Sequence, residues 1–236
     1  MLTRSLAGLG LGCLLLLSPL AGCSALVKEP PLDPWYFSAA PGATELAPAS
    51  VAQPDSGSRL KLNLRRVEGS AHLRENLAWR RGQRFGYHEE RRWTQTPAAY
   101  LRLAAERALF GSGATQRVLG YKGAVLELTL TAFEEAEGHA EVRVTAFLHR
   151  DDRSLLWTTL SERTELAAVP DSLGSGEEAE LKAGASAVEL DALSSSQQRE
   201  LLRGLRLAGG LRQALAKVVG KLRAQVLEAS RSASAK

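Results

Sequence analysis

The chain has 236 residues, of which 44% are hydrophobic and 24% charged, and its formal net charge is +4. This length is sufficient for one domain with a single hydrophobic core. Both cysteines, Cys13 and Cys23, lie near the N-terminus, which excludes a disulfide in the rest of the chain. Basic residues dominate between positions 59 and 107, and acidic residues between 127 and 189. We therefore expect a dipolar surface, which fits a basic face toward lipid phosphates, an acidic partner or an ordinary solvated surface.

The first residues have the pattern of an export signal. Arg4 precedes an apolar run over residues 6–17, which is too short to span a bilayer stably. The run leads into Leu20-Ala21-Gly22-Cys23, which resembles the lipobox of bacterial lipoproteins. The resemblance implies that residues 1–22 are a cleaved signal peptide, that Cys23 carries the lipid, and that Ser24 in place of Asp directs sorting to the outer membrane. A chance cysteine beside a signal peptide is the alternative.

Residues 23–58 are predicted to be the lipidated cysteine and a flexible tether. Prolines at positions 30, 31, 34, 41, 48 and 54 prevent a continuous helix or a central strand. Each buried acyl methylene contributes about 0.8 kcal/mol, so two or three chains on Cys23 would attach the protein almost permanently. Within the tether, Trp35-Tyr36-Phe37 is too apolar for a linker and predicts a short strand or an anchor on the domain. An exported protein does not meet nucleic acid, so we expect no nucleic-acid partner.

The folded domain is predicted over residues 59–229, and it begins with strands. Apolar and polar residues alternate strictly over 59–65, which indicates a half-buried strand with three leucines on one face. Residues 77–80 and 85–89 are predicted to form a hairpin whose turn uses Gly82.

A helix is predicted to follow the hairpin. Pro97 favours the first turn of a helix, and either Thr94 or Thr96 is a suitable cap. Apolar residues recur at helical spacing after Pro97. Gly111 and Gly113 are expected to end the helix.

Three strands with short turns are predicted next, over residues 125–133, 140–148 and 155–166. Their alternating residues indicate an antiparallel meander. Gly138 is expected in the first turn, and residues 151–154 in the second.

The last part of the domain is predicted to contain a loop and a long helix. Residues 167–187 are acidic and aperiodic, which indicates a flexible loop. Residues 195–227 have an apolar stripe at helical spacing, with a break expected at Gly209-Gly210, and residues 230–236 are expected to be a frayed tail. With a short strand predicted at Val118-Leu119, the pattern predicts an α/β domain in which two main helices pack on a mixed, largely antiparallel sheet.

The polar face of the second helix is basic. Arg212, Lys217, Lys221 and Arg223 lie on this face. It could contact anionic headgroups, while a helix packed on a sheet with a solvated basic face is the alternative.

Side chains that usually carry catalysis are scattered. The four histidines lie on separate predicted elements and show no metal-ligand spacing; they are His72, His88, His139 and His149. Gly111-Ser112-Gly113 and Gly174-Ser175-Gly176 lack the context of a nucleophile or phosphate site. The carboxylate pairs Glu134-Glu135 and Asp151-Asp152 lie at turns without an apolar pocket. We therefore expect no enzymatic activity, no cofactor and no metal.

A family resemblance rests on the segment from the hairpin to the first helix. The matching residues are Leu77-Ala78-Trp79-Arg80 to Tyr87, Arg92-Trp93, Pro97, Tyr100-Leu101 and Leu109. With the lipobox, the tether and the later elements, they resemble the auxiliary lipoproteins of ABC-type, MCE-associated lipid transporters, the paraquat-inducible protein C-like group. The resemblance covers most of residues 60–226. The chain departs from the family pattern at Glu68-Gly69-Ser70, where a proline is usual, and in its longer 167–187 segment.

The resemblance implies a non-enzymatic role at the outer membrane. The implied partners are the periplasm-spanning MCE protein with its permease and ATPase, the membrane through the lipid on Cys23, and phospholipid. The expected protein contacts are Trp79, Phe85, Tyr87 and Trp93, because large aromatic residues dominate interfaces. A place in the core is the alternative for Trp79 and Trp93. The competing function is a structural lipoprotein of another envelope or secretion assembly.

Overall fold

The computed structural model describes residues 34–40, 59–120, 123–184 and 190–234. They belong to one compact unit that starts at Pro34. Cys23, the predicted signal peptide and most of the predicted tether lie outside the described residues.

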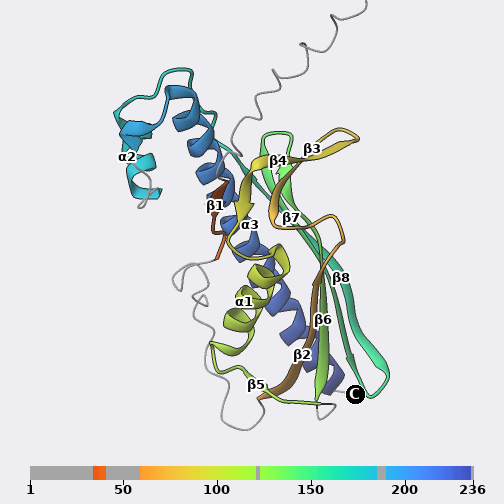
Figure 1. Cartoon of the computed structure of the whole chain (residues 1–236). Helices are drawn as coiled ribbons and strands as arrows, with labels where there is room; N and C mark the ends of the chain where they lie inside the picture. The colour runs from red at the N-terminus through yellow and green to blue at the C-terminus, as the bar shows by residue number, and fades with distance from the viewer. Residues whose placement is uncertain (1–33, 41–58, 121–122, 185–189, 235–236) are drawn as a thin grey trace, which may run out of the picture. The chain divides into compact units, whose positions relative to one another are not determined.

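An eight-stranded mixed sheet is the framework of this unit. Its central strand is β6, which has β7 along one edge (Figure 1). The other edge of β6 is shared by two strands: β2 pairs with residues 124–130 and β3 with residues 134–136. The strands are β1 (Trp35–Phe37), β2 (Leu60–Gly69), β3 (Asn76–Arg81), β4 (Arg84–Trp93), β5 (Thr115–Arg117), β6 (Ala124–Ala136), β7 (His139–Arg150) and β8 (Arg153–Glu165).

Strand direction follows from the connections. Short turns join β3 to β4, β6 to β7 and β7 to β8, and these pairs are antiparallel. The pairs β1–β4, β2–β5, β2–β6 and β3–β6 are parallel and need longer connections. The predicted hairpin and meander are confirmed. Gly82 and Gly138 have φ of +57° and +79°, and Asp151 and Asp152 have positive φ in the two-residue turn before β8.

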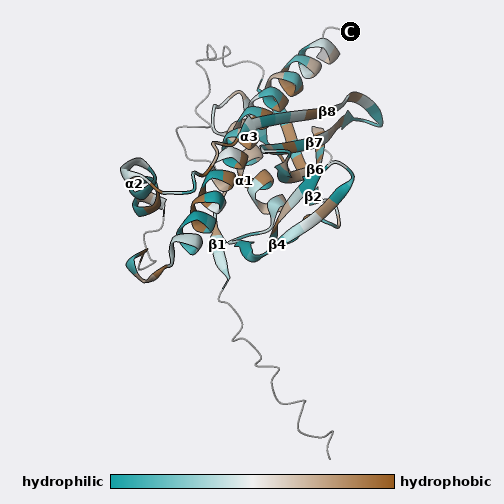
Figure 2. Ribbon diagram, turned by 90° about the horizontal axis from the view of Figure 1, so that it is seen from above, coloured by the Kyte–Doolittle hydropathy of each residue, from teal (hydrophilic) through white to brown (hydrophobic). Residues whose placement is uncertain are grey.

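The two main helices cover the same face of the sheet. Helix α1 (Pro97–Phe110) packs on β2 and β6, and α3 (Ser195–Ser234) packs on β7, β8 and α1. Figure 2 shows both helices on one side of the strands. Their apolar residues and the inner residues of the strands form one core. The predicted α/β fold is therefore confirmed. No helix within the described ranges is long and apolar enough to cross a membrane.

The predicted break at Gly209-Gly210 is wrong, because α3 runs without interruption for 40 residues. A methyl group at Gly210 would lie 2.7 Å from Leu166 and 2.9 Å from Cβ of Ala140. Gly210 therefore allows close contact between the helix and the sheet, and the packing compensates for its low helix propensity. The tail predicted from residue 230 is also wrong, because α3 extends to Ser234 and buried Ser230 donates a hydrogen bond to the Val226 carbonyl.

The loop predicted over 167–187 contains helix α2 (Ser175–Gly184), so Gly174-Ser175-Gly176 opens a helix. Residues 185–187 lie outside the described residues. Leu181 is 2% exposed and packs in the core, and Arg206 of α3 binds Glu180. Glu177 and Glu180 therefore pair with Arg206 of α3, which the local composition did not reveal. A short 3-10 helix, η1 (Leu190–Ala192), precedes α3.

Two local predictions around α1 also differ from the structure. Thr96 occupies the N-cap without a side-chain cap, and the Thr94 hydroxyl lies 2.8 Å from the Tyr100 hydroxyl. The short strand expected at Val118-Leu119 lies earlier, at Thr115–Arg117, and Leu119 is 82% exposed. The short strand expected at Trp35-Tyr36-Phe37 is confirmed as β1.

Candidate functional site

The predicted lipid-attachment residue, Cys23, lies outside the described residues, so its role stays a prediction. The predicted contact residues Trp79, Phe85, Tyr87 and Trp93 all lie on the β3–β4 hairpin or at its end. The structure separates them into three environments.

Trp93 is a core residue and not a partner contact. Its side chain is 2% exposed, with ring centroids 5.9 Å from Tyr100 and 5.3 Å from Phe133. Tyr100 and Phe133 are fully buried. The core alternative therefore holds for Trp93, because α1 covers the end of β4.

Phe85 and Tyr87 are brought together on one face of the hairpin. Their rings meet edge to face at 5.1 Å, and His72 meets Phe85 in the same way at 5.2 Å. The Tyr87 hydroxyl donates a hydrogen bond of 2.7 Å to the His72 carbonyl. We call Phe85 and Tyr87 the hairpin aromatic row. Both residues are half-buried, so their rings are held in place and still have an accessible surface.

Trp79 lies on the opposite face of the hairpin, since successive strand residues point to opposite faces. It faces Gly86 across the hairpin, and a methyl group at Gly86 would lie 2.5 Å from the indole ring. The Arg81 guanidinium lies 5.6 Å from the centre of the Trp79 ring. Trp79 is half-buried. Because it lies on the opposite face, it does not share a surface with Phe85 and Tyr87.

Two buried carboxylates lie beside the hairpin aromatic row. Glu134 and Glu141 pair directly across β6 and β7, and both are 2% exposed. Arg80 Nε donates to Glu134 at 2.5 Å, and this bond raises the pKa of the Arg80 guanidinium. Arg143 also binds Glu141, and Arg163 Nε donates to it at 2.9 Å. Three guanidinium groups thus compensate two adjacent negative charges.

The Arg80 guanidinium connects the charged cluster to the aromatic row, because it also lies 5.3 Å from the centre of the Phe85 ring. On the other face, His88 Nε2 is 3.5 Å from Glu135 Oε2, and His88 is the main cause of the lowered pKa of Glu135. The Arg80–Glu134 pair fixes the hairpin on the sheet by charge.

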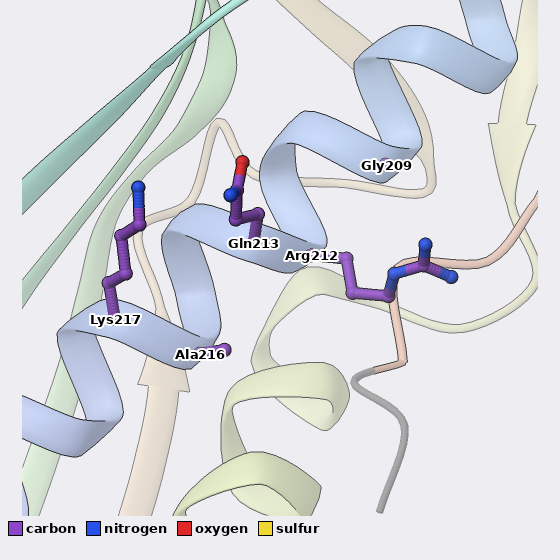
Figure 3. Close-up of a pocket in the computed structure, with 5 residues that line it drawn as sticks. All are labelled: Gly209, Arg212, Gln213, Ala216 and Lys217. Atoms are coloured by element: carbon purple, nitrogen blue, oxygen red, sulfur yellow. The ribbon is translucent and has the colours of Figure 1, made fainter. Parts of the chain in front are cut away.

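The basic face of α3 is only partly available. Lys221 binds Glu162 of β8, and Arg223 donates to the Ser112 hydroxyl. Arg212 and Lys217 line an open hollow of about 510 Å³ on α3. Figure 3 shows the two side chains extending from the helix in different directions. Lys217 is exposed. The remaining lining residues are Gly209, Gln213 and Ala216.

The sequence did not single out Trp157, which is 73% exposed on β8. Its ring lies 5.4 Å from that of Phe147, which is stacked on His149 at 5.1 Å. The sequence could have indicated this exposure, because the alternation along the strand puts Trp157 on the polar face, opposite its neighbour Leu156. In the part of the chain that the structure describes, no group of three His, Cys, Asp or Glu side chains could hold a metal ion.

The architecture defines an α/β protein with a mixed sheet and two long helices on one face. No known family model matches the sequence, and no curated protein matches it. Among solved structures, a Xanthomonas campestris protein of family DUF330 is similar over 86% of this chain and 99% of its own, with a TM-score of 0.54 and 13% identity. A crystal structure of an uncharacterized protein is similar over 82% of this chain and 99% of that one, with a TM-score of 0.51 and 9% identity. At these identities the chain shares the fold of the DUF330 protein.

Proposed function

We propose that the protein is an outer-membrane lipoprotein and a non-enzymatic auxiliary component of an MCE-type ABC phospholipid transport system. The observation that carries the anchoring is the Leu20 to Cys23 sequence, followed by a proline-rich segment that leads directly into β1. The MCE role is supported by the resemblance of residues 77–109 to the auxiliary lipoproteins of such transporters. The shared fold with a DUF330 protein supports the same general class.

We assign the contact with the MCE protein to the hairpin aromatic row. Phe85 and Tyr87 are accessible aromatic residues on a hairpin that projects from the sheet (Figure 1). Their positions are fixed by the His72 carbonyl and by Arg80, so little side-chain entropy is lost on binding. Aromatic residues held in this way are typical of binding hot spots.

The membrane contact rests on the lipid at Cys23, and the exposed Lys217 on α3 is the remaining candidate for phospholipid headgroups. Lys221 is less suitable because it is bound to Glu162. A single lysine contributes about 1 kcal/mol of attraction to an anionic surface. The acyl chains therefore dominate the membrane attachment in this proposal.

The test is affinity capture from detergent-solubilised envelopes, with mass spectrometry of the bound proteins. We expect an MCE-domain protein and its permease and ATPase to be captured by the wild type. Phe85→Ala should reduce the capture at least tenfold, because truncation of a hot-spot aromatic residue costs about 2 kcal/mol or more. Leu119→Ala is the matched control, since Leu119 is exposed and far from the hairpin in sequence.

Capture of envelope proteins without an MCE-domain protein would contradict the transport role and favour the structural lipoprotein. Equal capture by Phe85→Ala and by wild type would remove the hairpin from the interface. Melting of each purified variant is needed beside the capture, so that a loss of binding is not confused with a loss of folding.

A further inference from the structure

An open groove lies between the end of the sheet and the last turns of α3. One wall is the turn between β7 and β8 with the start of β8, and the other is the C-terminal end of α3 (Figure 1). The turn lies at the end of β6 opposite to the end that pairs with the hairpin. The groove has a volume of about 1090 Å³, which is large enough for a small-molecule ligand.

Four charged side chains line the groove, two of each sign. They are Arg150, Asp151, Arg153 and Glu228. Within the described part of the chain, no side-chain hydrogen bond or ion pair holds any of the four. The carbonyl groups at the end of α3 add partial negative charge on the side of Glu228. The groove therefore offers both signs of charge to a ligand, with the arginines on one wall and Glu228 on the other.

Two polar atoms beside the groove are buried and have no hydrogen-bond partner among the described residues. They are Nε of Arg150 and Oε1 of Gln225. Buried polar atoms in proteins usually bind another protein group, an ordered water or a ligand. The hydroxyl groups of Ser154 and Ser232 also line the groove. These neutral groups suit a polar ligand with several oxygen atoms.

The groove also has an apolar strip, which consists of Leu155, Leu156, Ala229 and Ala233. The first three of these residues are half-buried and pack against the core. The strip lies on the same two elements as the charged groups. A ligand that fits the whole groove is therefore amphipathic, with charges of both signs next to an apolar part.

We propose that this groove binds the headgroup of a zwitterionic phospholipid, with a phosphate ester beside a primary ammonium. Arg150 and Arg153 bind the phosphate oxygens, since guanidinium groups form paired hydrogen bonds with phosphate. Glu228 on the opposite wall accepts hydrogen bonds from the ammonium. The apolar strip contacts the first carbons of the acyl chains. This site goes beyond the proposed function, because it involves neither the hairpin aromatic row nor an MCE protein, and it is separate from Lys217.

The test is native mass spectrometry of the purified full chain in mild detergent, titrated with phosphatidylethanolamine, phosphatidylcholine or phosphatidylglycerol. We expect saturable binding of one phosphatidylethanolamine per chain, with a dissociation constant about tenfold or more below those of the other two lipids. The quaternary ammonium of phosphatidylcholine has no proton to donate to Glu228, and phosphatidylglycerol carries no cation.

Three substitutions at exposed residues identify the groove as the site. Arg153→Gln should raise the dissociation constant of phosphatidylethanolamine about tenfold or more, because it removes a charged hydrogen bond to the phosphate. Glu228→Gln should remove the preference for phosphatidylethanolamine over phosphatidylcholine. Arg231→Gln is the matched control, because it removes the same charge from the end of α3 but does not line the groove. It should bind as the wild type does.

A soluble competitor, glycerophosphoethanolamine, distinguishes the intact lipid from a free phosphoester. Displacement only at roughly a hundredfold excess would assign the site to the lipid, because the ester lacks the acyl carbons that the apolar strip contacts. Displacement at equal concentration would assign it to a soluble phosphoester.

Non-saturable binding would overturn the proposal, as would equal affinity for phosphatidylglycerol or unchanged binding by Arg153→Gln. Ala233→Trp is a second variant, which fills the groove without a change of charge and should also abolish binding. Thermal melting of each variant shows whether it is folded. Loss of this binding would leave the capture of an MCE-domain protein unchanged, so the two proposals fail independently.

Discussion

At the scale of single residues, the paired carboxylates of β6 and β7 are a feature that costs stability unless it is compensated. Glu134 and Glu141 face each other with 2% exposure each, and like charges at directly opposed positions are destabilising. They are tolerated because Arg80 serves one carboxylate while Arg143 and Arg163 serve the other. The hairpin is thereby tied to the meander by charge as well as by backbone pairing.

This unequal distribution of partners gives a prediction. Arg80→Ala leaves Glu134 buried without a cation and should lower the free energy of unfolding by about 2 kcal/mol. Arg163→Ala should cost less than about 1 kcal/mol, because Glu141 keeps Arg143 and the lost pair is largely solvent-exposed on its arginine side. Urea denaturation of both variants measures the difference. An equal effect of the two changes would contradict the assignment of partners.

The Glu135 contact predicts a pH dependence. Its pKa is below the ordinary value of 4.5, mainly because of His88, so the carboxylate is favoured in the folded state. The resulting stabilisation is fully present above pH of about 4.5 and is lost as the pH falls through the lowered pKa of Glu135.

His88→Ala should therefore move the Glu135 pKa upward in an NMR titration. The stability difference between wild type and variant should become smaller as the pH falls through the lowered pKa of Glu135. A difference that grows as the pH falls below 4 would show that another group is responsible.

At the scale of elements, α3 closes the core along its whole length. Leu215 and Leu222 are fully buried, seven residues apart on the helix face that packs on the sheet. Leu215→Asp should abolish stable folding, because an unpaired buried carboxylate costs several kcal/mol, comparable with the stability of a whole domain. Lys217→Glu is the matched control, since Lys217 is exposed two residues away. Thermal melting distinguishes the two variants, and cooperative melting of Leu215→Asp near the wild-type temperature would contradict this packing.

The elements also show how far sequence patterns were sufficient. Alternation and turn residues predicted the hairpin and the meander because each depends on neighbouring residues and on positive φ at the turns. Helix α2 was not predicted, because Leu181 and the partners of Arg206 are brought together only by tertiary contacts. The continuity of α3 through Gly209-Gly210 was missed for the same reason. Among the candidate contacts, Phe85 and Tyr87 lie on one surface, Trp79 lies on the opposite face of the hairpin, and Trp93 is buried.

At the scale of the whole molecule, the proposed function depends on attachment. Cys23→Ser should abolish labelling by fatty-acid analogues and shift the protein to a soluble or unprocessed pool. The wild type should stay in the membrane fraction at high salt, because acyl chains and not charges hold it there. Undiminished labelling of Cys23→Ser would end the lipoprotein interpretation.

Strand β1 gives the proposed attachment a mechanical consequence. Any pull transmitted along residues 24–34 reaches the folded unit first at Trp35, where β1 is held by three residues of parallel pairing with β4. Resistance behind that short strand comes from Phe37, which is 3% exposed and packs so closely on α3 that a methyl group at Gly204 would overlap its ring. Under tension between the membrane and a partner, β1 is therefore the first element to bear the load, and its detachment would withdraw Phe37 from the core.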